Sequence, residues 1–265
     1  IGKSYFVIDS DLILKTCLVL LGENIKFKVA NLDKNVVCQF ENNWDKISNA
    51  ITDAFTLLDS WHFNESNFKA KNAIIPLVYY IYHNDIKDIN NPIRHTEEKS
   101  VMRKWLCMSL LKRVFGGQTD TVLGDIRKVL KTNIGHGYFP LDEIKEAFKS
   151  SPSKNLSFTE DYINILLDTE KEHSDCFAIL SLLYPHLDYS QDFDKDHMHP
   201  EGYFRKLTES KTKESWMSDD DYAFYTNARN WNTIQNLQLL HKSLNRSKQE
   251  QSLADWIKEK NINPQ

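Results

Sequence analysis

The chain has 265 residues, of which 41% are hydrophobic and 26% charged, and its formal net charge is −4. This composition is typical of globular proteins and excludes a disordered, collagen-like or coiled-coil chain. With only 8 glycines and 7 prolines, the sequence favours long helices over many short strands. No apolar run reaches the roughly 20 residues that a membrane-spanning helix needs.

The cysteines and the first residues bear on the cellular compartment. Cys17, Cys38, Cys107 and Cys176 show no C-x-x-C spacing, which argues against a zinc ribbon or a redox motif. Isolated thiols suit a reducing compartment, and residues 1–4 lack the pattern of a secretory signal. We therefore expect a cytoplasmic protein. Because the chain does not begin with Met, we also expect it to be part of a longer protein.

Most of the chain up to residue 184 has the pattern of helices. Apolar residues spaced by three and four, as between Trp44 and Leu58, predict amphipathic helices, and capping residues or glycines mark their ends. Ser157 and Glu160 have capping-box spacing. The expected helices cover residues 10–21, 44–58, 73–82, 96–115, 119–131, 157–167 and 174–183.

The pattern changes after Pro185. Residues 187–194 alternate apolar and polar side chains, which predicts a short strand or hairpin, and residues 233–240 predict a second strand. The Lys- and Asp-rich residues 205–221 between them predict a loop. Residues 241–260 predict a helix with a break near residue 252. The expected order is thus strand, loop, strand, helix.

We expect a mainly α fold with two domains: a helical domain, residues 1–185, with a linker or regulatory role, and a small α+β domain, residues 186–265. Basic residues concentrate in residues 94–131, which hold 9 basic and 4 acidic side chains. This segment could be a solvated helix face. It could instead contact the phosphates of DNA, and the side chains expected to do so are Arg103, Lys104, Lys112 and Arg113.

The densest group of candidate functional residues lies in the second domain. His197 is the candidate general base for phosphodiester hydrolysis, because imidazole can deprotonate water near neutral pH. Asp196 and Asn245 could bind Mg²⁺, which prefers a few hard oxygen ligands. Lys248 lies three residues after Asn245, on the same helical face. Because successive residues of a strand face opposite sides, Asp196 and His197 share a site only if the strand ends in a bend.

Several stretches together resemble an HNH (ββα-metal) nuclease module. They are DHMHP at 196–200, IQNLQLL at 234–240, LNRSK at 244–248 and DW at 255–256. The combined motif is similar to the C-terminal nuclease domain of the GmrSD-type restriction and phage-defence family, over about residues 184–258. Residues 73–82 and 115–123 resemble the helical region that precedes that nuclease in the same family.

The resemblance implies roles for individual residues in a DNA endonuclease that uses Mg²⁺ or Mn²⁺. His197 matches the general base, and Asp196 matches a metal ligand beside it. Asn236 matches the central Asn that holds the base-bearing loop through hydrogen bonds. Asn245 matches the second metal ligand, where many relatives have His. Lys248 is a candidate phosphate contact.

The resemblance also implies partners. The substrate would be DNA, including modified phage DNA, within a prokaryotic restriction or anti-phage defence system. Any control by a nucleotide would come from an upstream nucleotidase-like domain, because the Gln-Gln-Arg motif of that domain does not occur here. A homo-oligomer is left open. Since the paired cysteines of zinc-containing relatives are missing, the fold must form without structural zinc.

Two alternatives remain open at this stage. His197 and His199 could share a strand face and bind zinc, which would indicate a metal hydrolase with another substrate. That reading leaves Asn236 and Asn245 without a role. The module could also be a catalytically silent DNA- or protein-binding part of a defence complex. Substitution of His197, with cleavage measured against binding, separates these readings.

Overall fold

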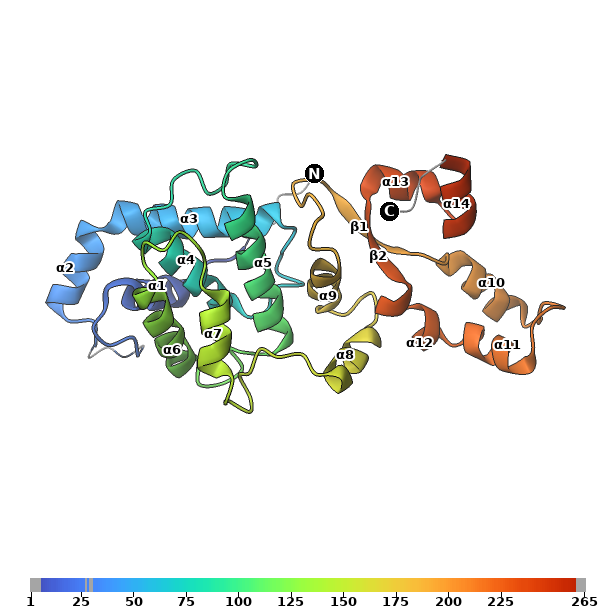
Figure 1. Ribbon diagram of the computed structural model, residues 1–265, viewed down its shortest axis with the longest axis horizontal. Helices are drawn as coiled ribbons and strands as arrows, with labels where there is room; N and C mark the ends of the chain where they lie inside the picture. Colours follow the sequence, from blue (N-terminus) through green and yellow to red (C-terminus); the bar gives the residue numbers. More distant parts are fainter. Residues whose placement is uncertain (1–5, 27, 29–30, 261–265) are drawn as a thin grey trace. The chain divides into compact units, whose positions relative to one another are not determined.

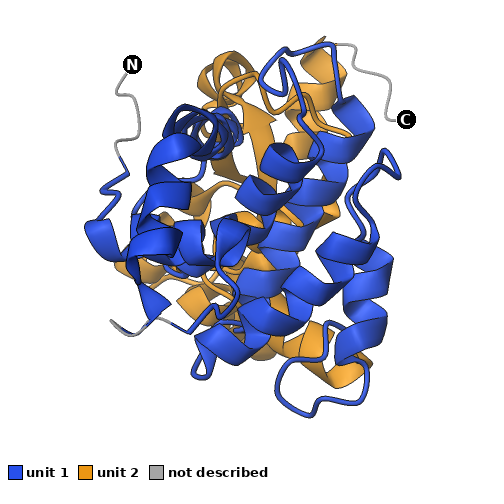
Figure 2. Ribbon diagram, turned by 90° about the vertical axis from the view of Figure 1, so that its left-hand side faces the viewer, with its two compact units in different colours: residues 1–157 blue, residues 158–265 orange. Residues whose placement is uncertain are grey.

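We describe a computed structural model of the chain (Figure 1) over residues 6–26, 28 and 31–260. Residues 1–4, which lack a secretory pattern, lie outside these described residues. The chain divides into two compact units, unit 1 with residues 1–157 and unit 2 with residues 158–265 (Figure 2). Within the described ranges, no helix combines the length and the apolar character that crossing a membrane requires.

Unit 1 is helical and is built around one apolar helix. Its elements are α1 (Ser10–Leu21), α2 (Lys34–Asn42), α3 (Trp44–Ser60), η2 (Lys71–Ile74), α4 (Ile75–His83), α5 (Thr96–Leu111), α6 (Thr119–Thr132) and α7 (Leu141–Phe148). Every residue of α4 before His83 is buried, as expected of a helix that is apolar on all sides. Helices α1, α3 and α6 pack against it, so α4 forms the centre of this core.

The predicted helices of unit 1 form, with differences at their ends. Asp9 accepts a hydrogen bond from the backbone N–H of Leu12 and caps α1. Helix α5 ends at Leu111, earlier than expected, because Arg113 adopts a left-handed backbone conformation with φ of 49°. The short helices α2 and α7 were not predicted.

Unit 2 contains the only sheet found among the described residues. Its elements are α8 (Glu160–Leu167), α9 (Cys176–Leu183), β1 (Phe193–His197), α10 (Glu201–Ser210), α11 (Asp219–Thr226), α12 (Ala228–Trp231), η3 (Ile234–Asn236), β2 (Leu237–His241), α13 (Lys242–Lys248) and α14 (Leu253–Lys260). The two strands pair antiparallel, and α13 packs on both of them. The fold is therefore mainly helical with one small sheet, as predicted.

The boundary between the units lies after residue 157, whereas the sequence placed it after residue 185. The apolar helix α9 packs on β2 and η3, and α8 packs on η3. Glu170 also forms a backbone bridge with Thr233. Residues 158–185 belong with the strands because these contacts complete the core around the sheet.

Other expectations for unit 2 are wrong in detail. The segment 205–221, predicted as a loop, lies largely in α10 and α11, and a capping box of Ser218 and Asp221 begins α11. No hairpin forms over residues 187–194, since β1 starts at Phe193. Helix α8 is capped by Thr159 instead of Ser157. The predicted break near residue 252 is present between α13 and α14.

Candidate functional site

The candidate residues lie on or beside strand β1. In the register of the sheet, Asp196 lies opposite Gln238 and His197 lies opposite Leu237. Both residues therefore remain in the paired strand, and the bend that would bring their side chains to one side is missing. By the alternation of a strand, Lys195 and His197 face one side of the sheet, while Asp194 and Asp196 face the other. The single pocket expected for the candidate base and the candidate metal ligands does not form.

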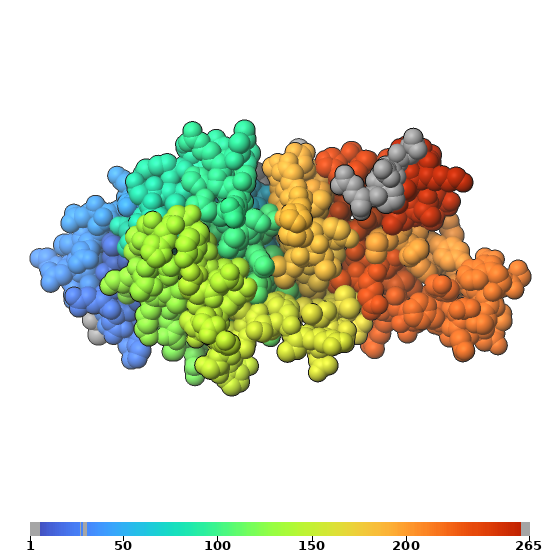
Figure 3. Space-filling model, viewed as in Figure 1, coloured from blue at the N-terminus to red at the C-terminus, as the bar shows by residue number. Residues whose placement is uncertain are grey.

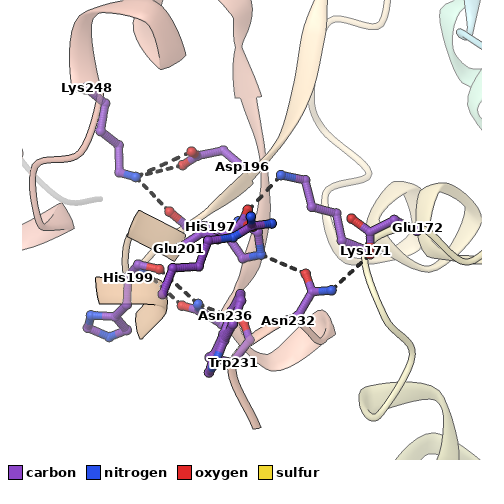
Figure 4. A network of polar contacts seen from close by, with 11 residues as sticks. Lys171, Glu172, Asp196, His197, His199, Glu201, Trp231, Asn232, Asn236 and Lys248 are labelled. Carbon is purple, nitrogen blue, oxygen red and sulfur yellow. Dashed lines mark hydrogen bonds and ion pairs between the residues drawn. The ribbon is translucent and has the colours of Figure 1, made fainter. Parts of the chain in front are cut away.

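His197 is buried, with 4% of its surface exposed, and both ring nitrogens have partners (Figure 4). Its Nε2 lies 2.9 Å from Oδ1 of Asn232, whose Nδ2 donates a hydrogen bond to Oε2 of Glu172 at 2.9 Å. Its Nδ1 lies 3.4 Å from Nζ of Lys171. Because a carboxylate only accepts hydrogen bonds, Glu172 fixes the orientation of the Asn232 amide. Nε2 of His197 therefore has the proton, and the unprotonated Nδ1 accepts a hydrogen bond from the Lys171 ammonium.

The surroundings of His197 favour its neutral form. Burial is the largest influence and lowers the pKa of His197 below its usual 6.5, and the charge of Lys171 acts in the same direction. The hydrogen bond to Asn232 and the charges of Glu201 and Asp196 oppose this shift. At neutral pH the imidazole is uncharged, which is the form that a general base requires.

Glu172, which orients Asn232, is ionised at neutral pH. Partial burial raises the pKa of its carboxyl, but the hydrogen bond from Asn232 and the charges of Lys171 and Lys195 outweigh burial and leave the pKa below its usual 4.5. Lys195 donates a hydrogen bond to the backbone oxygen of Lys171 and so connects β1 to this segment. The Lys171 ammonium and the Glu201 carboxylate thus lie 3.4 Å and 3.6 Å from Nδ1 of His197, while Glu172 acts on the ring through Asn232.

Asn236 holds the loop that follows His197. Its Oδ1 accepts a hydrogen bond from the backbone N–H of His199 at 2.8 Å, and its Nδ2 donates to the backbone oxygens of His199 and Trp231, each at 3.0 Å. Its own backbone oxygen accepts from Met198 at 2.8 Å. With 6% of its surface exposed, Asn236 makes the loop-holding hydrogen bonds that the HNH motif implies for its central Asn.

On the other side of the sheet, a buried lysine neutralises Asp196. Nζ of Lys248 lies 3.1 Å from Oδ2 of Asp196 and donates a hydrogen bond to the backbone oxygen of His197 at 2.6 Å. Gln238 also donates to Oδ2 of Asp196 at 2.9 Å. Only 1% of Lys248 is exposed, so the predicted phosphate contact by Lys248 is wrong. Its ammonium group is directed into the protein, as Figure 4 shows.

The two expected metal ligands have different partners. Nδ2 of Asn245 donates a hydrogen bond to Oδ2 of Asp194 at 3.0 Å, whereas Asp196 is paired with Lys248 and Gln238. Across the described part of the chain, no three His, Cys, Asp or Glu side chains are grouped to hold a metal ion. As arranged, Asp196 and Asn245 do not fit a cation shared between them, because a cation would have to displace the Lys248 ammonium from Asp196.

The alternative zinc pair of His197 and His199 is not favoured either. His199 follows the last residue of β1 and is exposed. It therefore does not share the strand face on which His197 lies. Nε2 of His197 is already bonded to Asn232, and Nδ1 lies beside the Lys171 ammonium. Two aligned imidazoles on one face, which the zinc reading requires, do not occur here.

The four basic candidates of unit 1 differ in their exposure. Arg103 is buried in α5, with 7% of its surface exposed, so the prediction that it contacts DNA is wrong. Lys104 is exposed, Lys112 is half-buried and Arg113 is exposed. Arg113 also donates a hydrogen bond to the backbone oxygen of Leu110 at 3.2 Å. At most Lys104, Lys112 and Arg113 remain as candidate phosphate contacts.

Several residues of the site were not found from the sequence. Asp194 could have been found, because strand alternation places it beside Asp196. Glu201 lies four residues after His197, and its Oε2 is 3.6 Å from Nδ1 of that ring. Lys171 and Glu172 lie more than twenty residues upstream, before the predicted domain boundary, and no local pattern connects them to His197. The same is true of Asn232.

Comparison of the chain with models of known protein families gives no match, and comparison with curated proteins gives none. The interpretation of the site therefore depends on its geometry and on the motif resemblance. The geometry offers one buried neutral imidazole with a fixed tautomer, an adjacent ammonium group and a loop held by Asn236.

The pairing of Lys248 with Asp196 can be tested by Lys248→Met, which removes the charge and keeps much of the length. Because Asp196 would stay buried without a counter-charge, we expect the free energy of unfolding to fall by about 3–5 kcal/mol, measured by urea denaturation. Lys242→Met, an exposed change on the same helix, should have little effect. Asp196→Asn combined with Lys248→Met should recover most of the loss.

The same variant tests cation binding at Asp196. If the carboxylate can hold a divalent ion, Mn²⁺ should stabilise Lys248→Met more than the parental chain, because the competing ammonium is gone. Equal stability of Lys248→Met and Lys242→Met would show that the buried pair is not the stabilising contact described above.

Proposed function

We propose that unit 2 is a DNA endonuclease of the HNH type, acting in the cytoplasm as part of a prokaryotic restriction or anti-phage defence protein. The observation that supports this proposal most is the state of His197. Its ring is neutral, Nε2 is bonded to Asn232, and the unprotonated Nδ1 lies 3.4 Å from the Lys171 ammonium, which water would have to replace as the hydrogen-bond donor to Nδ1. A base of this kind beside a cation suits an attack of water on a phosphate diester.

The proposed reaction uses the groups on the His197 side of the sheet. Nδ1 of His197 accepts a proton from water as the water oxygen bonds to phosphorus. As that bond forms, the bond from phosphorus to the 3′ oxygen breaks and the 3′ oxygen takes a proton from solvent, which leaves 5′-phosphate and 3′-hydroxyl ends. The proton on Nδ1 of His197 then passes to solvent. Asn232 accepts a hydrogen bond from Nε2 throughout and Glu201 lies near the ring, so both favour the imidazolium that forms. Lys171 offsets the negative charge that grows on the phosphoryl oxygens.

The divalent cation of the proposal, Mg²⁺ or Mn²⁺, has a different basis. The motif resemblance alone implies this cation. The structure gives it no free ligand at Asp196, because the oxygens of that carboxylate are engaged by Lys248 and Gln238. No step described above depends on it. The resemblance is likewise the basis for an upstream nucleotidase-like domain, for modified phage DNA as substrate and for self-association.

A catalytically silent DNA- or protein-binding module is the second candidate. The Lys248–Asp196 pair favours it, because an HNH site with a neutralised carboxylate lacks a free metal ligand. The charge of unit 2 favours the protein-binding form of this candidate over a DNA-binding form, since residues 158–265 hold 19 acidic and 12 basic side chains. Such a surface repels DNA unless cations intervene. Cleavage measured separately from binding decides between the two candidates.

His197→Ala tests the proposed function directly. We expect the rate of plasmid cleavage to fall by about 10²- to 10⁴-fold because the general base is lost, while DNA binding changes little. His186→Ala, at an exposed position of unit 2, should leave cleavage unchanged. The parental rate should rise with pH with a midpoint below 6.5 and level off above that midpoint, since burial lowers the pKa of His197 below its usual value. Cleavage by His197→Ala at the parental rate would refute the assignment.

Glu172 and Asn232 are positioning residues in this proposal. Glu172→Gln should lower kcat about tenfold with little change in KM, because a Gln amide no longer fixes the Asn232 orientation. Glu170→Gln, an exposed neighbour, is the matched control. Asn232→Asp should move the rise of kcat to higher pH, since an adjacent anion raises the pKa of His197. An unchanged pH profile in Asn232→Asp would contradict the contact as a determinant of the base.

The salt dependence of DNA binding tests the remaining basic residues of unit 1. If Lys104, Lys112 and Arg113 contact phosphates, their joint change to Ala should reduce the dependence of log K on log[salt] by up to about 0.9 per residue. Lys34→Ala with Lys149→Ala, both exposed in unit 1, should leave that dependence unchanged. Fluorescence anisotropy at several salt concentrations measures it. Equal slopes for both sets of variants would exclude the contact.

A further inference from the structure

A pocket of unit 2 lies outside the chemistry described above and is lined mainly by aromatic rings. Its volume is about 380 Å³, within the range of about 300–1,000 Å³ that small-molecule sites have. Helices α10 and α11 and the segment after α13 supply its walls, which include Tyr203, Phe204, Trp216, Tyr225, Glu250 and Ser252. Figure 3 shows the atoms of the α10–α11 segment as one continuous stretch of surface.

A continuous row of rings connects this pocket to His197. The centre of the His197 ring lies 5.8 Å from that of Trp231, and Trp231 stacks on Phe204 at 5.3 Å with an angle of 8° between the planes. Phe204 stacks in turn on Tyr225 at 5.8 Å and 23°. Trp216 meets Tyr225 edge-on at 6.3 Å. The pocket therefore lies a few ring widths from the proposed base.

We propose that this pocket binds an unpaired nucleobase of the nucleic acid whose phosphate reaches His197. The inference rests on the proposed endonuclease function and adds its substrate class: a strand with at least one base outside the double helix. Aromatic side chains bind bases of any sequence by stacking, because every base has a π face. Phe204 and Tyr225 lie nearly parallel, so a flat ring can extend their stack.

The exposure of the rings agrees with a ligand at this place. Trp216 is 63% exposed and Tyr203 is 40% exposed, although both line the pocket. Covering them with a stacked base would remove apolar surface from water. On α10, which forms part of the pocket wall, the side chains of Arg205 and Lys206 are 66% and 74% exposed. Arg205 is paired with Glu201 and Lys206 with Glu250, so the phosphates that flank a bound base would compete with these carboxylates for the two exposed cations.

An ammonium ligand, the other guest that aromatic pockets bind, fits less well. The charge of Glu250 is already compensated, because its Oε2 lies 2.9 Å from Nζ of Lys206. The other carboxylate oxygen lies over Gly202, where an added Cβ would be only 2.7 Å away. Paired in this way, Glu250 can still accept a hydrogen bond from the exocyclic amine of a base.

The test uses the full chain with His197→Ala, so that the strand stays uncut. Binding of a labelled oligodeoxycytidine strand is compared with binding of the same strand made abasic, by fluorescence anisotropy. Adding Trp216→Ala should weaken binding of the normal strand about five- to a hundredfold and leave binding of the abasic strand unchanged. Tyr203→Ala is a second variant of the pocket. Trp44→Ala, which removes a Trp that is 45% exposed in unit 1, is the control.

Each outcome decides the proposal. Equal affinities of the Trp216→Ala and Trp44→Ala chains for the normal strand would overturn it, and so would an equal loss for the normal and abasic strands. Displacement of the strand by tetramethylammonium chloride, beyond the effect of equal NaCl, would assign the pocket to a cation. If the parental chain cuts no DNA but Trp216-dependent binding of bases persists, the endonuclease proposal fails while the base pocket stands.

Discussion

The antiparallel pairing of β1 with β2 up to His197 decides where every candidate group lies. Because the pairing continues to the last residue of β1, the pleat of the strand places Asp196 and His197 on opposite sides. On the side of the two aspartates, α13 packs against the sheet. Its Lys248 pairs with Asp196, and its Asn245 donates a hydrogen bond to Asp194. The other side meets the segment before α9, which brings Lys171 and Glu172 to the imidazole. The pairing of β1 with β2 thus keeps the two aspartates on one side of the sheet and the imidazole with Lys171 and Glu172 on the other.

Much of the fold was predictable because local patterns determine it. The apolar residues of α4, the cap at Asp9 and the break before α14 all follow from neighbouring residues. The short helices α10 and α11 were not predictable in the same way, because their segment is rich in Lys and Asp and buries few side chains. Their place depends on contacts with each other and with α12.

The site shows a similar division. The motif located His197, and it located Asn236, whose hydrogen bonds hold the following loop. It could not show that the Lys248 ammonium would turn inward, since a Lys three residues from Asn245 has the same pattern whether it faces solvent or a carboxylate. Nor could it identify Asn232 and Glu172, which meet His197 through the tertiary fold alone.

The position of Lys171 and Glu172 has a practical consequence for anyone isolating the nuclease-like part. A fragment designed from the motif alone would begin near residue 185 and discard both side chains together with α9. In that fragment, Asn232 would lack the Glu172 carboxylate that fixes its orientation, and the imidazole of His197 would lack the neighbouring Lys171 ammonium. The side of β2 that α9 covers would be exposed to water. Inactivity or aggregation of that fragment would reflect the place of the cut and would say nothing about the intact unit.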